Sequence, residues 1–140
     1  MPLSGVRIID LTDERGIYGA KLLADLGADV VRPEPPEGDP LRQRGPLTAT
    51  DKAAQTSLWH AFFASNRRFF TLDLDTASGR EQLDQLMLRA DIVLTCDNAF
   101  AVKEADLAER SAQRPELIVI DVSSFGTSGP WKNYLAPDLI

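Results

Sequence analysis

Apolar and polar positions follow two alternating patterns along this chain. Short apolar runs predict buried strands at residues 6–11, around 30–31, and at 69–74, 92–95 and 117–122, the last being the most strongly apolar. Helices are predicted between these runs, over residues 16–26, 57–64, 77–89 and 102–113. Strands that alternate with helices form a mostly parallel sheet with helices on both faces. The pattern therefore predicts an α/β fold.

Residues 22–40 carry the most informative change of pattern. The apolar residues with helical spacing are Leu22, Leu23 and Leu26. Gly27 is the residue type at which helices end, and a strand begins near Val30. The proline-rich residues 33–40 then leave that strand as a stiff, extended loop. Ligands of open α/β sheets usually bind at loops that follow the carboxyl ends of strands, so this loop is a candidate binding element.

Polar residues precede the predicted helices. Thr12 or Asp13 is expected to cap the helix that starts near Gly16, and Ser57 is expected to cap the helix over residues 57–64. The turn after the first predicted strand contains glycine but does not have the G-x-G-x-x-G spacing. The chain therefore lacks the dinucleotide-binding fingerprint, which disfavours a nucleotide-binding α/β domain of that kind.

Composition narrows the classes of partner. The 140 residues include 15 basic and 21 acidic side chains, a net charge of -6, which disfavours general binding to nucleic acid or to a membrane surface. Two local basic clusters, at residues 42–44 and 67–68, remain suited to one phosphorylated small molecule. No charged and apolar leader opens the chain, and no apolar run approaches the about 20 residues that span a bilayer. We expect a cytoplasmic protein.

The chain contains one cysteine and one histidine. An intrachain disulfide is excluded, and a zinc site of the usual four-ligand Cys/His kind cannot form, so no metal is expected. Cys96 follows a predicted strand but has no neighbouring base in its motif, and we interpret it as a packed residue rather than a nucleophile. His60 lies between aromatic residues and is interpreted as a packed histidine.

Six stretches, in the same order, resemble the amino-terminal part of one enzyme family. They are residues 3–12 (L-x-G-V-R-I-I-D-L-T), 23–32 (L-A-D-L-G-A-D-V-V-R), 34–42 (E-P-P followed by G-D-P-L-R), 66–74 (N-R-R before L-D-L), 90–93 (A-D-I-V) and 124–130 (S-F-G-x-S-G-P). Together they are similar to family III CoA-transferases, which include formyl-CoA and carnitine CoA-transferases and the related α-methylacyl-CoA racemases.

The resemblance implies a Rossmann-like domain over residues 1–140 that binds coenzyme A or acyl-CoA as a substrate, in a homodimer whose subunits interlock. Transferases of this family use an aspartate that forms an acyl anhydride and then a thioester with CoA. That aspartate lies beyond the point that matches Ile140, and Asp138 matches a different aspartate. The chain is thus expected to be a CoA-binding part that ends before the catalytic residue, with no catalytic residue of its own.

The resemblance also implies where CoA is contacted. The candidate residues are Arg32, Arg42, Arg44, Arg67, Arg68, Leu72, Asp73, Leu74, Asp75, Asn98, Phe125, Gly126 and Asp138. Arginine side chains suit phosphate because the planar guanidinium makes paired hydrogen bonds, although each arginine can equally be a solvated surface charge. Asp73 and Asp75 match the stretch around the adenosine, although an aspartate before a helix is also an ordinary cap. The glycine-rich loop at residues 125–130 can approach the thioester or form a plain turn.

Three departures from the family pattern affect these expectations. Pro35 stands where the family often has a phosphate-binding arginine, which leaves Arg32, Arg42 or Arg44 as substitutes. Residues 95–101 replace the family's Glu-Asn-Phe-Arg-Pro-Gly loop. Pro137 replaces the catalytic histidine of the racemases, so racemase chemistry is the least favoured activity. The chain is predicted to be the CoA-binding part of a CoA-transferase or, alternatively, a non-catalytic CoA-binding or interaction module.

Overall fold

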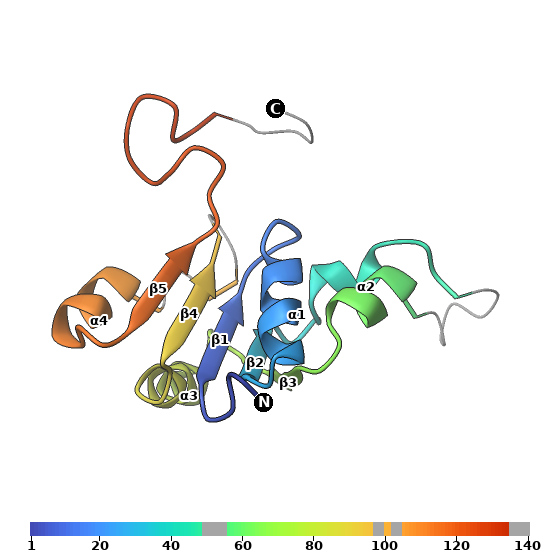
Figure 1. The fold of residues 1–140 in the computed structure, drawn as a ribbon, viewed down its shortest axis with the longest axis horizontal. Coiled ribbons are helices and arrows are strands. Elements are labelled where there is room, and N and C mark those ends of the chain that lie inside the picture. Colours follow the sequence, from blue (N-terminus) through green and yellow to red (C-terminus); the bar gives the residue numbers. More distant parts are fainter. Residues whose placement is uncertain (49–55, 97–99, 102–104, 135–140) are drawn as a thin grey trace.

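The computed structural model describes residues 1–48, 56–96, 100–101 and 105–134. Its centre is a parallel sheet with the strand order β3-β2-β1-β4-β5 (Figure 1). The strands are β1 (Arg7–Leu11), β2 (Asp29–Glu34), β3 (Arg68–Thr71), β4 (Ile92–Thr95) and β5 (Ile118–Asp121). Ile9 in the central strand is in register with Val31 on one side and Val93 on the other. The predicted parallel α/β sheet is confirmed.

Helices cover both faces of the sheet, as predicted. They are α1 (Ile17–Asp25), α2 (Leu58–Phe63), α3 (Ala77–Met87) and α4 (Leu107–Gln113), with a short 3-10 helix, η1 (Pro40–Gln43). Ile8 points to the face where Ala20 and Ala24 of α1 pack, whereas Ile9 points to the face where Leu83 and other residues of α3 pack. The alternation of neighbouring isoleucines thus supplies both halves of the core.

The cap of α1 differs from the prediction. Gly16 is the N-cap residue and makes no side-chain hydrogen bond, so neither Thr12 nor Asp13 caps the helix with its side chain. Instead the backbone carbonyl of Asp13 accepts from the N–H groups of Gly16 and Ile17. The cap predicted for α2 is confirmed, because the Ser57 hydroxyl accepts from the N–H of His60 at 2.9 Å.

Several predicted apolar positions are exposed. Leu22 and Leu26 are 45% and 46% exposed on the outer side of α1, and only Leu23 of that leucine set packs against the sheet. The strongly apolar strand predicted at residues 117–122 is β5, at the edge of the sheet, where Ile118 and Ile120 are also exposed. The most apolar of the predicted strands is thus an edge strand with exposed side chains.

The last described residues, up to 134, leave the carboxyl end of β5 and extend away from the sheet (Figure 1). Among the described residues, α4 begins at Leu107, and positions 102–104 of the helix predicted over residues 102–113 lie outside the described part of the chain. None of the helices described here is long and apolar enough to cross a membrane.

Candidate functional site

A cavity of about 190 Å³ lies at the carboxyl ends of β1 and β2. The turn after β1 contributes Thr12, Asp13 and Glu14 to its lining, and Phe100 follows β4. The chain runs from β1 outward through β2 to β3 and then returns to β4 on the other side of β1. Open α/β sheets bind ligands at such a reversal, outside the carboxyl ends of the strands. The cavity therefore occupies the expected position for a ligand.

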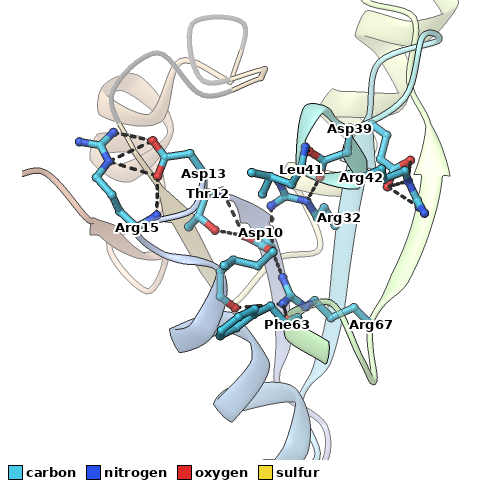
Figure 2. Close-up of polar contacts among 12 residues, drawn as sticks. Asp10, Thr12, Asp13, Arg15, Arg32, Asp39, Leu41, Arg42, Phe63 and Arg67 are labelled. Carbon is cyan, nitrogen blue, oxygen red and sulfur yellow. Dashed lines mark hydrogen bonds and ion pairs between the residues drawn. The ribbon is translucent and has the colours of Figure 1, made fainter. Parts of the chain in front are cut away.

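Asp10, Arg32 and Asp39 line this cavity and belong to a buried network of polar contacts, which Figure 2 shows. Asp10, at the end of β1, has no exposed surface, and its Oδ1 accepts from the Thr12 N–H at 3.0 Å and from the Thr12 hydroxyl at 2.6 Å. Its Oδ2 forms ion pairs with the Nη1 atoms of Arg67 and, at 3.1 Å, of Arg32. The Nε of Arg32 donates to Oδ2 of Asp39 at 2.6 Å.

The charges of this network balance, with two carboxylates against two guanidinium groups. Burial opposes the charge of Arg32, but the nearby Asp10 and Asp39 outweigh it and raise the pKa of Arg32 above its ordinary value. Burial lowers the pKa of Arg67, an effect that Asp10 partly offsets. Arginine nevertheless stays protonated in proteins, so both side chains are charged. Removing one partner would leave an uncompensated buried charge.

Arg32 and Arg67 are therefore not solvated surface charges. Arg67 also donates to the backbone carbonyls of Ile17, at 3.0 Å, and Phe63, and so connects α1 to the end of α2. This geometry favours a structural role for both arginines, which hold the buried carboxylates and backbone next to the cavity in place. Their predicted contacts with CoA stay predictions.

Arg42 and Arg44 are not lining residues of the cavity; they follow Leu41, which is one, and their side chains are 43% and 48% exposed. Arg42 makes a forked contact with Glu34, with its Nε 3.0 Å from each carboxylate oxygen and its Nη2 2.6 Å from Oε1 (Figure 2). Arg44 donates to Oε1 of Glu14 at 2.9 Å, and Glu14 lines the cavity. Both guanidinium groups are accessible to an anion that competes with these carboxylates.

Arg68 lies elsewhere, at the amino end of its strand. It begins β3, forms an ion pair with Asp29, and borders a separate open groove of about 670 Å³ together with Arg7 and Phe70. The structure therefore does not bring Arg68 together with Arg42 and Arg44.

The predicted stretch at residues 72–75 joins β3 to α3. The Leu72 side chain is fully buried in the core, and Leu74 packs against the same core. Oδ1 of Asp73 accepts from the Asp75 N–H at 3.0 Å, but the α3 cap is the hydroxyl of Thr76, which accepts from the Gly79 N–H. The alternative interpretation of Asp73 or Asp75 as the helix cap was therefore wrong. Contact of this stretch with adenosine stays a prediction.

The remaining candidates lie after β4 and β5. Phe125 makes an edge-to-face contact with Tyr134, with 6.3 Å between ring centroids, and Gly126 has a positive φ of 80° in the same loop. Asn98 and Asp138 lie outside the described residues. Arg15, in the turn after β1, reaches Ser124 at 3.5 Å, so the loop after β5 approaches the same end of the sheet as the cavity.

Cys96 and His60, which the sequence analysis interpreted as packed residues, are both buried. Cys96 has no exposed surface, and burial raises the pKa of its thiol to about 12. The thiol is therefore neutral near pH 7, which agrees with its interpretation as a packed residue. His60 is 7% exposed and lies beside Phe69, with 5.7 Å between ring centroids.

Sequence reasoning missed the acidic members of the site. Asp10, Glu34 and Asp39 are the partners that fix the arginines, yet none was singled out. A signal was present for Asp10, because an aspartate inside a run such as V-R-I-I-D-L would be buried in a strand and would need a positively charged partner. For Asp39, the signal was an aspartate directly before Pro40, which is common at the start of a helical turn.

The strand order defines a Rossmann-like α/β domain, and the cavity beside β1 is a candidate ligand site at the carboxyl edge of its sheet. Comparison with known proteins identifies the family: residues 3–140 match CoA-transferase family III, and the chain belongs to that family. The family predicted from the sequence is thereby confirmed.

Individual relatives agree with this assignment. The chain is 36% identical to a subunit of succinyl-CoA:(R)-benzylsuccinate CoA-transferase from Thauera aromatica over 138 residues, which cover 97% of this chain and 34% of that protein. It is 35% identical to succinyl-CoA--D-citramalate CoA-transferase from Chloroflexus aurantiacus, with 94% of this chain and 33% of that protein covered. The chain thus spans about a third of the length of these relatives.

Solved structures show the same fold. A CAIB/BAIF family protein from Brucella suis superimposes with a TM-score of 0.83 at 29% sequence identity, covering 99% of this chain and 37% of the other. Rv3272 from M. tuberculosis, in its orthorhombic form, gives a TM-score of 0.80 at 26% identity, with 99% and 39% covered. The Rossmann-like α/β fold is therefore shared along nearly the whole chain.

Proposed function

We propose that residues 1–140 are the CoA-binding part of an enzyme that moves CoA between carboxylic acids. The observation that carries this proposal is the cavity at the carboxyl ends of β1 and β2, beside the half-exposed Arg42 and Arg44, in a chain of CoA-transferase family III. The nucleophilic aspartate expected for the family would belong to polypeptide outside residues 1–140. These residues by themselves would bind CoA without transferring it.

The charge distribution suggests how phosphate groups would be held. Arg32 and Arg67 are held by buried carboxylates, whereas the half-exposed Arg42 and Arg44 pair with Glu34, which is buried, and with Glu14, which is exposed. A phosphate can replace a carboxylate on a guanidinium group because both accept paired hydrogen bonds. We therefore propose Arg42 and Arg44 as the phosphate contacts.

Size limits how much of CoA the cavity can enclose. Sites for drug-sized ligands have volumes of about 300–1,000 Å³, and the cavity has about 190 Å³. It would therefore hold one portion of CoA, while the rest would lie along the carboxyl edge of the sheet. The loop that contains Phe125 and Gly126 begins at that edge, after β5, and is proposed to face the pantetheine or thioester end.

Exposed apolar side chains on and next to α1 and α2 form a surface that would suit contact with a second subunit. Tyr18, Leu22 and Leu26 lie on the outer side of α1, and Leu58 and Phe62 are exposed on the neighbouring α2. Clusters of exposed apolar side chains of this kind mark protein interfaces. We propose that this surface is covered in a homodimer of the complete enzyme.

Calorimetric titration of CoA into the protein tests the binding proposal. The variant that carries both Arg42→Gln and Arg44→Gln should bind CoA at least about tenfold more weakly, because each lost charged hydrogen bond weakens binding. Arg110→Gln on α4 is the matched control, since Arg110 pairs with Asp84 and donates to the Ala105 carbonyl, neither of which is a candidate CoA contact, and it should leave the affinity unchanged. Absence of saturable binding at millimolar CoA, or an unchanged affinity in the double variant, would contradict the proposal.

An assay of CoA transfer, with an acyl-CoA donor and a carboxylate acceptor, tests the expected division of labour. We expect no turnover by residues 1–140 alone, and turnover by this polypeptide would refute the placement of the nucleophile elsewhere. The intact mass of the native protein distinguishes a part of a longer transferase from the alternative, a non-catalytic CoA-binding or interaction module. A native mass near the 15.4 kDa of this chain would favour the non-catalytic binding module.

A further inference from the structure

A second cluster of polar side chains lies beside the cavity. Glu34 ends β2, Asp39 caps η1, and His60 belongs to α2. Each offers one possible ligand atom, and these three atoms lie within 4.8 Å of one another. All three residues are buried. Two carboxylates and an imidazole in this arrangement are ligands that zinc-class ions bind.

His60 has free binding capacity. Its Nε2 is buried and has no hydrogen-bond partner in the structure, although buried polar atoms are normally paired. A metal ion binds the lone pair of a ring nitrogen of histidine, so an imidazole with an unpartnered nitrogen is suited to be a ligand.

The two carboxylates already have partners, and those partners differ in how firmly they are held. Asp39 accepts from the buried Arg32 and, through its other oxygen, from the Leu41 N–H at 2.8 Å. Each carboxylate oxygen has two lone pairs, so Asp39 can also bind an ion. Glu34 is held by Arg42, whose side chain is 43% exposed and can turn into solvent. Arg42 is therefore the group with which a cation competes.

We propose that His60, Glu34 and Asp39 form a three-ligand site for a divalent cation of the zinc class. Zinc holds nitrogen and oxygen ligands at about 2.0–2.2 Å in a tetrahedron, which places the ligand atoms roughly 3.4 Å apart. Small side-chain rotations bring atoms within 4.8 Å to that spacing. The fourth position would be taken by water. An imidazole ligand disfavours Mg²⁺ and Ca²⁺, which prefer oxygen.

This site differs from the zinc site that composition excludes. One cysteine and one histidine rule out a four-ligand Cys/His centre, but a mixed site needs only one histidine because carboxylates supply the other ligands. Asp39 also lines the cavity, so the ion would lie next to the proposed CoA pocket. The inference is independent of CoA binding, because its ligands and its test involve the protein and the metal alone.

Titration of ZnCl₂ into chelator-treated protein, followed by calorimetry, tests the proposal. We expect binding of one ion per chain. Because the chain has a single histidine, its imidazole signals in NMR report on this site alone and should shift or broaden as zinc or Co²⁺ is added. His60→Gln should abolish the binding, whereas Glu37→Gln, at an exposed carboxylate of the neighbouring loop, should not change it.

A second variant keeps the test decisive if His60→Gln fails to fold. Arg42→Gln removes the competing guanidinium from Glu34 and should tighten zinc binding by about tenfold. Imidazole signals that do not respond to zinc, or zinc affinity that is unchanged in both His60→Gln and Arg42→Gln, would overturn the proposal. Failure of the protein to bind CoA would not affect either result.

Discussion

Asp10→Asn is the most informative substitution in the buried network. The amide has nearly the same shape as the carboxylate, and its oxygen can still accept from the N–H and hydroxyl of Thr12. Its NH₂ group, however, would face the guanidinium groups of Arg67 and Arg32, which also only donate. The variant thus retains the packing and loses one negative charge between two buried positive charges.

The magnitude follows from that loss. In the wild type, Asp10 and Asp39 balance Arg32 and Arg67, while in the variant one buried positive charge has no partner. Breaking a buried pair by removing one partner costs about 3–5 kcal/mol. A domain of this size is stabilised by about 5–15 kcal/mol in total. We therefore expect a large fall in stability, or loss of folding, together with a decrease in melting temperature of about 10 °C or more.

Urea unfolding followed by circular dichroism measures this effect. Asp84→Asn is the matched control, because Asp84 pairs with Arg110 at the surface and such pairs contribute about 0–1 kcal/mol. Adding Arg67→Met to Asp10→Asn restores the balance of one carboxylate and one guanidinium, so the double variant should be more stable than the sum of the two single effects predicts. A loss below about 1 kcal/mol for Asp10→Asn would refute the reasoning.

Three further predictions concern other buried groups. Gly79→Ala should destabilise the protein by about 1–3 kcal/mol in urea unfolding, because an added Cβ would lie 1.8 Å from the backbone oxygen of Asp73; an increase in stability would contradict this. The lowered pKa of His60 means that the unfolded chain binds its proton more readily, so the free energy of unfolding should fall as pH decreases below about 6.5. His60→Gln should weaken that dependence, and an identical profile would disprove the assignment. The thiol of Cys96, buried and with its pKa at about 12, should react with a thiol reagent at pH 8 only after unfolding, and rapid native reaction would show that it is accessible.

The sequence predicted the sheet well because strand and helix periodicities were clear. The pair Ile8 and Ile9 illustrates why: neighbouring apolar residues in a strand require cover on both faces, and α1 and α3 provide it. The leucine spacing also predicted α1 correctly, but it did not say which leucines are buried. A leucine at helical spacing indicates an apolar face, but α1 has apolar residues on both sides, and only the structure shows that Leu22 and Leu26 face outward.

The candidate site was predicted less well, because sequence spacing does not say which charges meet. Arg32 and Arg67 are 35 positions apart in the numbering, yet both contact one carboxylate oxygen, Oδ2 of Asp10. Their common partner follows from the parallel register that places β3 beside β2 and β2 beside β1. The position of the cavity after β1 and β2 was predictable from the fold class, whereas the identity of the charged residues that line it was not.

The arginines near the cavity therefore fall into two groups, one buried and one half-exposed. Arg32 and Arg67 are held by carboxylates in the interior, where losing either charge alters the balance on which folding depends. Arg42 and Arg44 are half-exposed, and their partners differ: Glu14 is exposed, whereas Glu34 is buried, so displacing Glu34 from Arg42 costs more than displacing Glu14 from Arg44. In the proposed mode of CoA binding, a phosphate would replace these glutamates on the outer arginines, while the inner arginines would keep the carboxyl edge of the sheet in shape. Substitutions of the inner arginines should thus lower stability, and substitutions of the outer arginines should lower affinity.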